Sequence, residues 1–272
     1  MISVITPTYN RAYSLERLYS SLISQTNKDF EWIIINDGST DDTEEIITKF
    51  VMEQLINIVY EYQKNSGKHK ALNKAIKKAK GDLIFFVDSD DYLTDNCIEF
   101  IAEKWELIRR DKTFAGLSGS IVSPKGEMIG DLGGTKTLEY IDTNAFEYRY
   151  KYKVKGDKAE VFRKEIIEKY TFPEIKDEKF IPEALVYNRI AEDGYRLRWF
   201  KEPIYVCEYR KDGLTAQGDI LFVKSWNGYS LYLKEMLTYR GVPTLLKLKL
   251  LLYYIRLSYK YKKSILSLIK FK

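Results

Sequence analysis

The stretch Leu83-Ile84-Phe85-Phe86-Val87-Asp88-Ser89-Asp90-Asp91 runs from an apolar segment directly into three carboxylates. Its first part is short and rich in aromatic and branched side chains, which predicts a buried β-strand. Similar apolar runs lie at residues 3–5, 32–35 and 56–62, each followed by polar or turn-forming residues. The N-terminal part of the chain is therefore expected to form a buried sheet.

Segments with the apolar spacing of helices separate these strands. Residues 39–42, Ser-Thr-Asp-Asp, precede two glutamates and mark the start of one helix. The apolar positions are Leu15, Leu18 and Leu22, then Ile46, Ile47 and Phe50, then Ala71, Ala75 and Ala79. This alternation predicts an α/β fold with a mostly parallel sheet flanked by helices, in which ligands bind at the carboxyl ends of the strands.

The second half is less regular. A helix with apolar residues at 98–108 is followed by residues 116–152, where we expect irregular strands and loops. A helix at 184–191 and short strands at 197–200 and 205–209 complete the predicted core. We predict a domain at residues 1–215, with a nucleotide-sugar half at 1–110 and an acceptor half at 111–215, and then a helical extension at 216–272.

Composition excludes several classes of protein. The 272 residues are 45% hydrophobic and 31% charged, as in ordinary globular proteins, so disorder is excluded. The only cysteines, Cys97 and Cys207, form no CxxC or Cys/His cluster, which argues against structural zinc and a disulfide framework. The sequence shows neither a secretory leader nor an apolar run of about 18 residues, so we expect a cytoplasmic protein.

The acidic cluster Asp88, Asp90 and Asp91 is the most specific chemical signal. Crowded carboxylates repel and raise one another's pKa unless they share a cation. Mg²⁺ and Mn²⁺ take such oxygen ligands together with substrate phosphates. An exposed Asx turn or helix cap is the alternative, but the position of the cluster at the end of a buried strand favours a metal site.

Polar residues at other strand ends complete a candidate site. Thr6-Pro7-Thr8-Tyr9-Asn10 and Asn36-Asp37-Gly38-Ser39 can hydrogen-bond a planar base and stack on it. Gly67 and Lys68 at a helix start suit a phosphate, although the Walker A spacing is absent. His69 is the only histidine, which excludes a three-histidine zinc site and leaves a structural or a catalytic role for this residue.

Together these motifs, in this order and spacing, resemble family 2 glycosyltransferases, strongly over residues 1 to 110 and more weakly over 155–215. The resemblance implies a GT-A fold and inverting transfer of a sugar from a nucleotide-diphosphate donor to an acceptor hydroxyl. It also implies that Asp37 contacts the base and that Asp90 leads the binding of Mn²⁺ or Mg²⁺, assisted by Asp88, with Asp91 as a competing ligand. The residues implied to bind the nucleotide sugar are Thr6, Pro7, Thr8, Tyr9, Asp37, Gly67, Lys68, Asn73, Asp88 and Ser89.

The catalytic base of that family stands in a downstream Glu-Asp pair, before an amphipathic helix and an arginine. Counting back from Arg189 and Gly194 puts Glu183 at the position of the base, with Pro182 in place of the preceding glutamate. Glu178 is the second candidate. The structural alternative for Glu183 is a residue of the first helical turn, stabilised by the helix dipole.

The C-terminal segment is basic. Residues 237–272 contain nine lysines and arginines and no Asp or Glu. We predict an amphipathic helix in which Lys249, Arg256, Lys260, Lys263 and Lys270 form one stripe beside Leu248, Ile255, Leu266 and Ile269. Through residues 243–272 it would bind an anionic membrane surface, peripheral to the inner face of the cell membrane. The equal alternatives are packing on the catalytic domain and a dimer contact.

We therefore expect a glycosyltransferase in cell-envelope polysaccharide or glycolipid synthesis. A UDP-sugar is the favoured donor, the acceptor is a saccharide or is lipid-linked, and nucleic acid is not an expected partner. A sugar-nucleotide pyrophosphorylase would require a Gly-rich, basic loop after the first strand, which residues 6–11 lack. A non-catalytic sugar- or nucleic-acid-binding protein is the other alternative, suggested by 14% aromatic residues and the basic tail.

Overall fold

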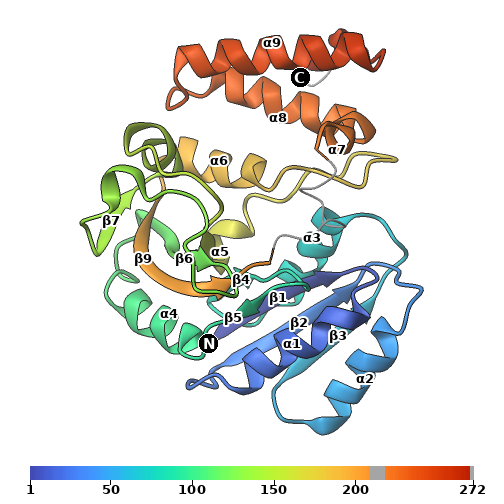
Figure 1. Ribbon diagram of the computed structural model, residues 1–272, viewed down its shortest axis with the longest axis vertical. Helices are drawn as coiled ribbons and strands as arrows, with labels where there is room; N and C mark the ends of the chain where they lie inside the picture. The colour runs from blue at the N-terminus through green and yellow to red at the C-terminus, as the bar shows by residue number, and fades with distance from the viewer. Residues whose placement is uncertain (209–217, 270–272) are drawn as a thin grey trace.

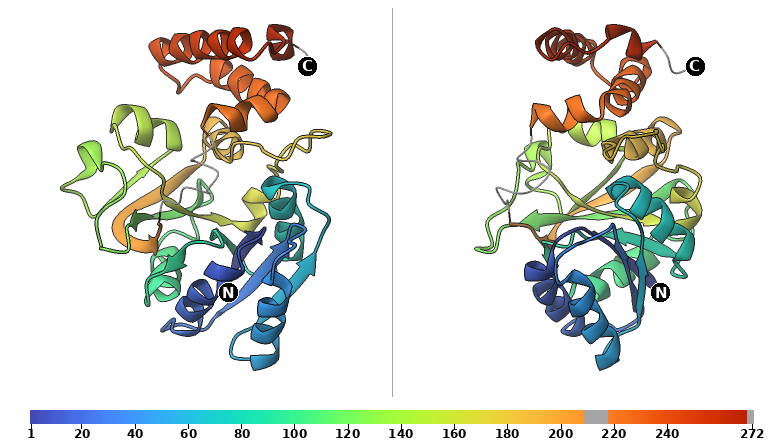
Figure 2. Two further views of the ribbon diagram at one scale, coloured as in Figure 1. Left: turned by 45° about the vertical axis from the view of Figure 1, so that its right-hand side comes forward. Right: turned by 90° about the vertical axis from the view of Figure 1, so that its right-hand side faces the viewer.

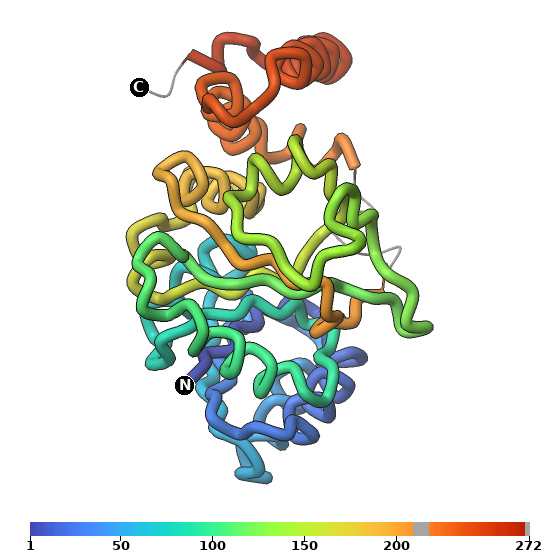
Figure 3. The backbone as a smooth tube through the Cα atoms, turned by 90° about the vertical axis from the view of Figure 1, so that its left-hand side faces the viewer, coloured from blue at the N-terminus to red at the C-terminus, as the bar shows by residue number. Residues whose placement is uncertain are grey.

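The computed structural model describes residues 1–208 and 218–269. Its centre is a sheet of nine strands in the order β3-β2-β1-β4-β8-β6-β9-β5, with β7 paired to β9 outside this path. Helices cover both faces of the sheet, and α8 and α9 form a separate layer at the end remote from the N-terminal half (Figure 1). Figures 2 and 3 show this order of layers from three further directions.

The N-terminal half is the predicted parallel unit. Strands β1 (Ile2–Thr8), β2 (Phe30–Asn36), β3 (Ile58–Tyr62) and β4 (Leu83–Phe86) pair in parallel. Side chains of β1 and β2 alternate between two cores, because helices cover both faces. Val4 and Trp32 face α1 (Ala12–Ile23) and α2 (Thr43–Glu53), whereas Ile5 and Ile33 face α3 (Lys68–Lys78).

Antiparallel pairing joins this unit to the second half of the sheet. Strand β8 (Ala159–Arg163) runs antiparallel between β4 and β6 (Phe114–Val122). Strand β9 (Arg196–Val206) is parallel to β6, and its curved course (Figure 1) carries its last residues to β5 (Tyr92–Leu93). Strand β7 (Tyr140–Thr143) pairs with the first part of β9.

Shorter elements fill the edges of this half. Helix α4 (Cys97–Glu106) packs in the same core as α1, and α6 (Ala184–Glu192) packs with α3 in the other core. The remaining elements are α5 (Lys164–Ile167), a 3₁₀ turn at Gly133–Thr135 and a π-helical turn at Glu147–Lys151.

The structure refines one prediction for this half and corrects another. Irregular strands and loops were expected over residues 116–152, and this stretch begins within the fully buried strand β6, whose pairing with β9 shifts register and whose Gly and Ser residues suit close packing between β8 and β9. A Cβ at Gly119, for example, would lie 2.5 Å from Ile204 Cγ1. The two predicted short strands are the single strand β9, which tolerates Pro203 where its pairing with β6 shifts register. Residue 209 of the predicted second strand lies outside the described residues.

Helices α7 (Asp219–Lys224), α8 (Trp226–Thr238) and α9 (Thr244–Lys260) form the C-terminal layer. The long basic helix predicted for the tail is only partly correct, because α9 ends at Lys260 and Lys262 has a φ of 51°. A 3₁₀ turn at Ile265–Leu268 follows, and Lys270 lies outside the described residues. Over residues 1–208 and 218–269, no helix has the length and apolar character that crossing a bilayer demands. The domain boundary at 215 stays a prediction.

Candidate active site

The acidic cluster forms a tight turn after β4. Asp88, Asp90 and Asp91 each place a carboxylate oxygen within 4.8 Å of the others, and the Asp91 N–H donates to Asp88 O at 3.1 Å. Burial, and then the neighbouring Asp88, raises the pKa of Asp90 and raises that of Asp91 to about 7. A hard divalent cation would offset this repulsion, so the donor set fits Mg²⁺ or Mn²⁺.

The three carboxylates have different surroundings. Asp91 is buried and turned toward β9, where it accepts hydrogen bonds from Tyr205 Oη at 2.7 Å and from the backbone N–H of Glu208 at 3.3 Å. Asp90 Oδ2 lies 3.6 Å from Arg11 Nε, and Asp88 remains partly exposed. Asp88 and Asp90 are therefore the better placed ligands, while Asp91 anchors the turn.

Lys68 connects this cluster to the second half of the molecule. Its Nζ lies 2.5 Å from Asp88 Oδ1 and 2.8 Å from Glu183 Oε1. Burial alone would lower the pKa of Lys68, but the two carboxylates outweigh it and raise the pKa. Glu183 directly precedes α6, and its Oε2 accepts a hydrogen bond from Tyr187 Oη at 3.0 Å. The structure thus brings Glu183 beside Asp88.

Glu178 has a different environment. It is buried, and Oε1 accepts hydrogen bonds from the backbone N–H of Asn227 at 2.7 Å and from Asn227 Nδ2 at 2.9 Å. Its Oε2 accepts a third from the N–H of Gly228 at 2.7 Å. These contacts satisfy the first N–H groups of α8. All three hydrogen bonds of Glu178 go to α8. Of the two candidate bases, only Glu183 lies at the acidic cluster, through its ion pair with Lys68.

Asp37 holds the loop that delivers Lys68. Its Oδ1 accepts from Gln63 Nε2 at 2.7 Å and from Ser66 N–H at 2.8 Å, and its Oδ2 accepts from Gly67 N–H at 2.8 Å. Gly67 has a φ of 108°, and a Cβ there would lie 2.3 Å from Lys179 O. This positioning role was not predicted. The expected contact of Asp37 with a base stays a prediction.

The other predicted nucleotide-binding residues differ in whether their side chains are exposed to a ligand or already hydrogen-bonded. The sequence Thr6-Pro7-Thr8 belongs to β1 rather than to a turn after it, and Thr6 Oγ1 already accepts a hydrogen bond from Trp32 Nε1 at 2.9 Å. Thr8 Oγ1 is buried and has no hydrogen-bond partner among the described residues, while the ring of Tyr9 is 47% exposed. Tyr9 is therefore the candidate at this strand end that is open to a ligand, whereas Thr8 carries a buried hydroxyl beside it, unpaired within residues 1–208 and 218–269.

Asn73, Ser89 and His69 are buried. Asn73 exchanges two hydrogen bonds of 2.9 Å with the backbone of Phe172, and Ser89 O accepts one from Ser14 Oγ at 2.8 Å. Burial, with a smaller contribution from Lys70, lowers the pKa of His69 to about 4. These hydrogen bonds give Asn73 a structural role. Because His69 is buried and its lowered pKa keeps it neutral, we interpret His69 as structural as well.

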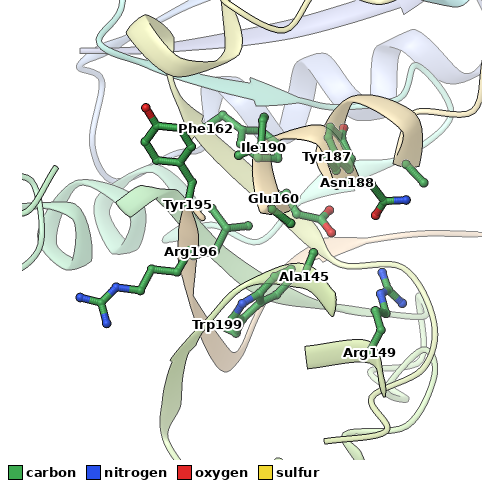
Figure 4. Close-up of a pocket in the computed structure, with 13 residues that line it drawn as sticks. Ala145, Arg149, Glu160, Phe162, Tyr187, Asn188, Ile190, Tyr195, Arg196 and Trp199 are labelled. Atoms are coloured by element: carbon green, nitrogen blue, oxygen red, sulfur yellow. The ribbon is translucent and has the colours of Figure 1, made fainter. Parts of the chain in front are cut away.

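A small cavity beside α6 was not predicted. It has a volume of about 70 Å³ and lies between α6, β8 and β9 (Figure 4). Glu160 and Arg149 line it, and Tyr187 stands between it and Glu183. Burial raises the pKa of Glu160 to about 7. Side chains alternate along β8, and this alternation places Glu160 on the cavity side. The alternation could have identified Glu160, but residues 159–163 were not predicted to be a strand.

Comparison with known families gives a match over residues 3–171 to the model described as glycosyl transferase family 2. The chain belongs to glycosyl transferase family 2. Over 226 residues it is 26% identical to the uncharacterized glycosyltransferase EpsJ of Bacillus subtilis, covering 79% of this chain and 63% of that protein. Over 92 residues it is 39% identical to the putative teichuronic acid biosynthesis glycosyltransferase TuaG of the same species, covering 34% and 36%.

The glycosyl transferase family 2 match has clear limits. The chain spans less than two thirds of the length of these relatives, and the match ends before Glu178 and Glu183.

Solved structures confirm the GT-A fold. TarS 1–349 of S. aureus in complex with UDP-GlcNAc superposes with a TM-score of 0.71 at 20% identity, covering 100% of this chain and 76% of that one. The mannosyltransferase PcManGT from Pyrobaculum calidifontis, in complex with GDP-Man and Mn²⁺, gives 0.58 at 18% identity, covering 98% and 74%.

Proposed function

We propose that this protein is an inverting glycosyltransferase that moves a sugar from a nucleotide-diphosphate donor to an acceptor hydroxyl. The observation that carries the proposal is the bridge of Lys68 between Asp88 and Glu183. It puts a cation for the leaving diphosphate next to a carboxylate that can take the acceptor proton. Family membership and the shared fold support the same reaction class.

Donor binding follows from the strand ends and the start of α3. Tyr9, which is exposed beside the buried Thr8 hydroxyl, would contact the nucleoside, and Gly67 and Lys68 would meet the diphosphate, where the helix dipole favours negative charge. Asp88 and Asp90 would hold a Mg²⁺ or Mn²⁺ ion, which would supply Lewis-acid neutralisation of charge on that diphosphate. Arg11 lies at the edge of this pair and adds positive charge.

The transfer step requires one base. Glu183 accepts the proton of the acceptor hydroxyl while the hydroxyl oxygen forms a bond to the anomeric carbon. The bond from that carbon to the diphosphate oxygen breaks, and its electrons leave with the diphosphate, whose charge Lys68 stabilises. Because the acceptor attacks directly, without a covalent intermediate on the protein, the anomeric configuration inverts.

The donor and the acceptor are proposed as chemical classes. The UDP-GlcNAc complex of TarS supports a UDP-sugar donor, and the similarity to TuaG, a putative teichuronic acid biosynthesis glycosyltransferase, supports a role in cell-envelope polysaccharide synthesis. The acceptor would be a saccharide or a lipid-linked saccharide reaching Glu183 from the side of α6. The short distance from Glu183 to Lys68 limits the reacting hydroxyl to this part of the surface.

A nucleotide-release assay tests the proposal. UDP-, GDP- and TDP-sugars are compared with and without Mn²⁺ on the wild type, on Asp90→Asn and on the control Asp95→Asn, an exposed aspartate outside the cluster. We expect metal-dependent release from one donor that is lost in Asp90→Asn and retained in Asp95→Asn. Absence of release, together with absence of metal-dependent nucleotide binding, would contradict the proposal.

A further inference from the structure

Helix α9 presents an apolar stripe to solvent. Its exposed members follow a spacing of three, four, three and four residues, which places them on one side of the helix. They are Leu245 (65% exposed), Leu248 (52%), Leu252 (56%), Ile255 (41%) and Tyr259 (91%). We call these five residues the α9 apolar stripe. A contiguous apolar surface of this kind is typical of an interaction site.

The core of the C-terminal layer does not use this stripe. The opposite side of α9 supplies Tyr254 and Leu257, which are buried against Trp226, Tyr229 and Leu233 of α8. Tyr254 Oη also shares a hydrogen bond of 2.8 Å with Ser230 Oγ. The helix is thus held in place by its inner face, and the outer stripe needs another explanation.

Basic residues run along one edge of the stripe. Lys249, Arg256 and Lys260 are exposed, and each follows directly after a stripe residue, so all three lie on the same flank. Residues 237–272 contain no Asp or Glu. Of the three cations, Lys260 has an acidic partner elsewhere, because its Nζ lies 3.7 Å from Oδ2 of Asp219 in α7. The outer surface of α9 is therefore apolar in the middle and cationic along one side.

The position of α9 directs this surface away from the sheet. Helix α9 lies on the far side of α8, at the end of the molecule (Figures 1 and 2). Helix α8 is tied in turn to α6 by Arg189, which donates to Glu235 at 2.6 and 2.9 Å. Because Glu183 directly precedes α6, a surface that holds α9 would also hold the acceptor side of the site at a fixed orientation.

We propose that α9 lies in the plane of an anionic lipid bilayer. The α9 apolar stripe would enter the boundary of headgroups and acyl chains, and Lys249, Arg256 and Lys260 would meet lipid phosphates. A second copy of the chain is the weaker occupant, because pairing of two such faces brings Lys249 and Arg256 of both copies together, while Asp219 is already paired with Lys260 of its own chain. The inference goes beyond the transfer reaction and does not depend on it.

Vesicle co-sedimentation tests the inference. Vesicles of phosphatidylcholine alone are compared with vesicles holding roughly 30% phosphatidylglycerol, at low and high salt. We expect the wild type to partition at least tenfold more strongly to the anionic vesicles, with salt weakening it. Replacing Lys249 and Arg256 by Gln should lower partitioning to the anionic vesicles about fivefold for each residue. The double variant Leu248→Glu/Leu252→Glu should reduce partitioning by more than tenfold.

The matched control is Met52→Glu/Leu55→Glu, which alters two exposed apolar residues at the far end of the molecule, 75% and 60% exposed. It should bind vesicles like the wild type. Failure of the wild type to bind anionic vesicles at low salt, or unchanged binding by Leu248→Glu/Leu252→Glu, would overturn the proposal. A lipid-free dimer in sedimentation velocity that the same double variant dissociates would overturn it in favour of a second copy. Binding needs no turnover, so this test stands apart from the nucleotide-release assay.

Discussion

Glu183 is the residue on which the proposed reaction depends most. Its two oxygens are shared between Lys68 and Tyr187, so the side chain is held in one orientation at the acidic cluster. Glu183→Gln keeps the shape but removes the basic oxygen. General base catalysis contributes about 10²- to 10⁴-fold, so we expect turnover to fall by that factor.

The donor affinity of Glu183→Gln, measured by calorimetric titration of the nucleotide, should stay close to that of the wild type. Glu192→Gln, at the exposed end of the same helix α6, serves as the control and should keep full turnover. Unchanged turnover in Glu183→Gln would remove this residue as the base.

His69 predicts a pH dependence of stability. The pKa of His69 is about 4 in the folded protein, against about 6.5 in an unfolded chain. Between these values the unfolded state binds the proton and the folded state does not, so stability is lost as the pH falls below about 6.5. Between about pH 7.5 and about pH 5 the loss from this residue should be about 2 kcal/mol.

Urea unfolding at the two pH values, for the wild type and His69→Gln, measures this contribution. The variant has no group to titrate at this position and should show the smaller dependence on pH. Identical pH dependence in both proteins would show that His69 is not held neutral by burial.

The residues of the site were predictable where the signal is local. Asp88, Asp90 and Lys68 stand at the ends of recognisable elements, and each lies where its strand or helix was expected to place it. Glu178 is a second candidate base from the sequence because it lies five residues before Glu183, on an expected loop that could reach the same site. Its hydrogen-bond partners, Asn227 and Gly228, follow it by 49 and 50 residues. No local pattern reports such a contact.

At the level of elements, the start of α3 is the most constrained turn. Gly67 combines a φ of 108° with a close approach to Lys179 O, while Gly194 has a φ of 87° and no atom within 4 Å of where a Cβ would stand. Gly194→Ala should therefore cost only the backbone strain, about 1 kcal/mol. Gly67→Ala should cost more and should displace Lys68.

Chemical unfolding and nucleotide titration of these two variants measure both effects. We expect weaker nucleotide binding in Gly67→Ala and wild-type binding in Gly194→Ala. Equal destabilisation of the two variants, with unchanged binding, would mean that the loop can move away from Lys179 without disturbing the site.

The parallel strands were predictable because burial on both faces makes each one a continuous apolar run. The length and full burial of strand β6 were not predictable, since its Gly and Ser residues are suited to close neighbours on β8 and β9 that a single sequence does not reveal. The end of α9 was missed for a related reason. Helical spacing continues past Lys260 in the sequence, but the backbone reverses at Lys262.

At the scale of the whole molecule, Glu178 fastens the C-terminal layer to the catalytic part. Glu178→Ala removes three hydrogen bonds, two of them to the backbone at the start of α8. Loss of such a buried, charged cap should cost about 2 kcal/mol. For a chain of this size, that lowers the melting temperature by roughly 4 to 8 °C.

Thermal unfolding measures the loss, and nucleotide titration should show unchanged donor binding, because the hydrogen bonds of the Glu178 side chain go to α8 and not to the acidic cluster. Glu192→Ala is the control for removal of a glutamate that is exposed. Lost turnover without lost stability in Glu178→Ala would instead return this residue to the list of candidate bases.

The curved course of β9 also has a consequence for synthesis of the chain. The acidic turn leaves the ribosome early, but the hydroxyl that anchors Asp91 belongs to Tyr205, 114 residues later. Strand β5, directly after the turn, likewise waits for the end of β9. A nascent or prematurely terminated chain that already contains residues 3–171 therefore lacks the anchor of its acidic turn. The acidic turn is completed late during translation, after most of the fold that surrounds it.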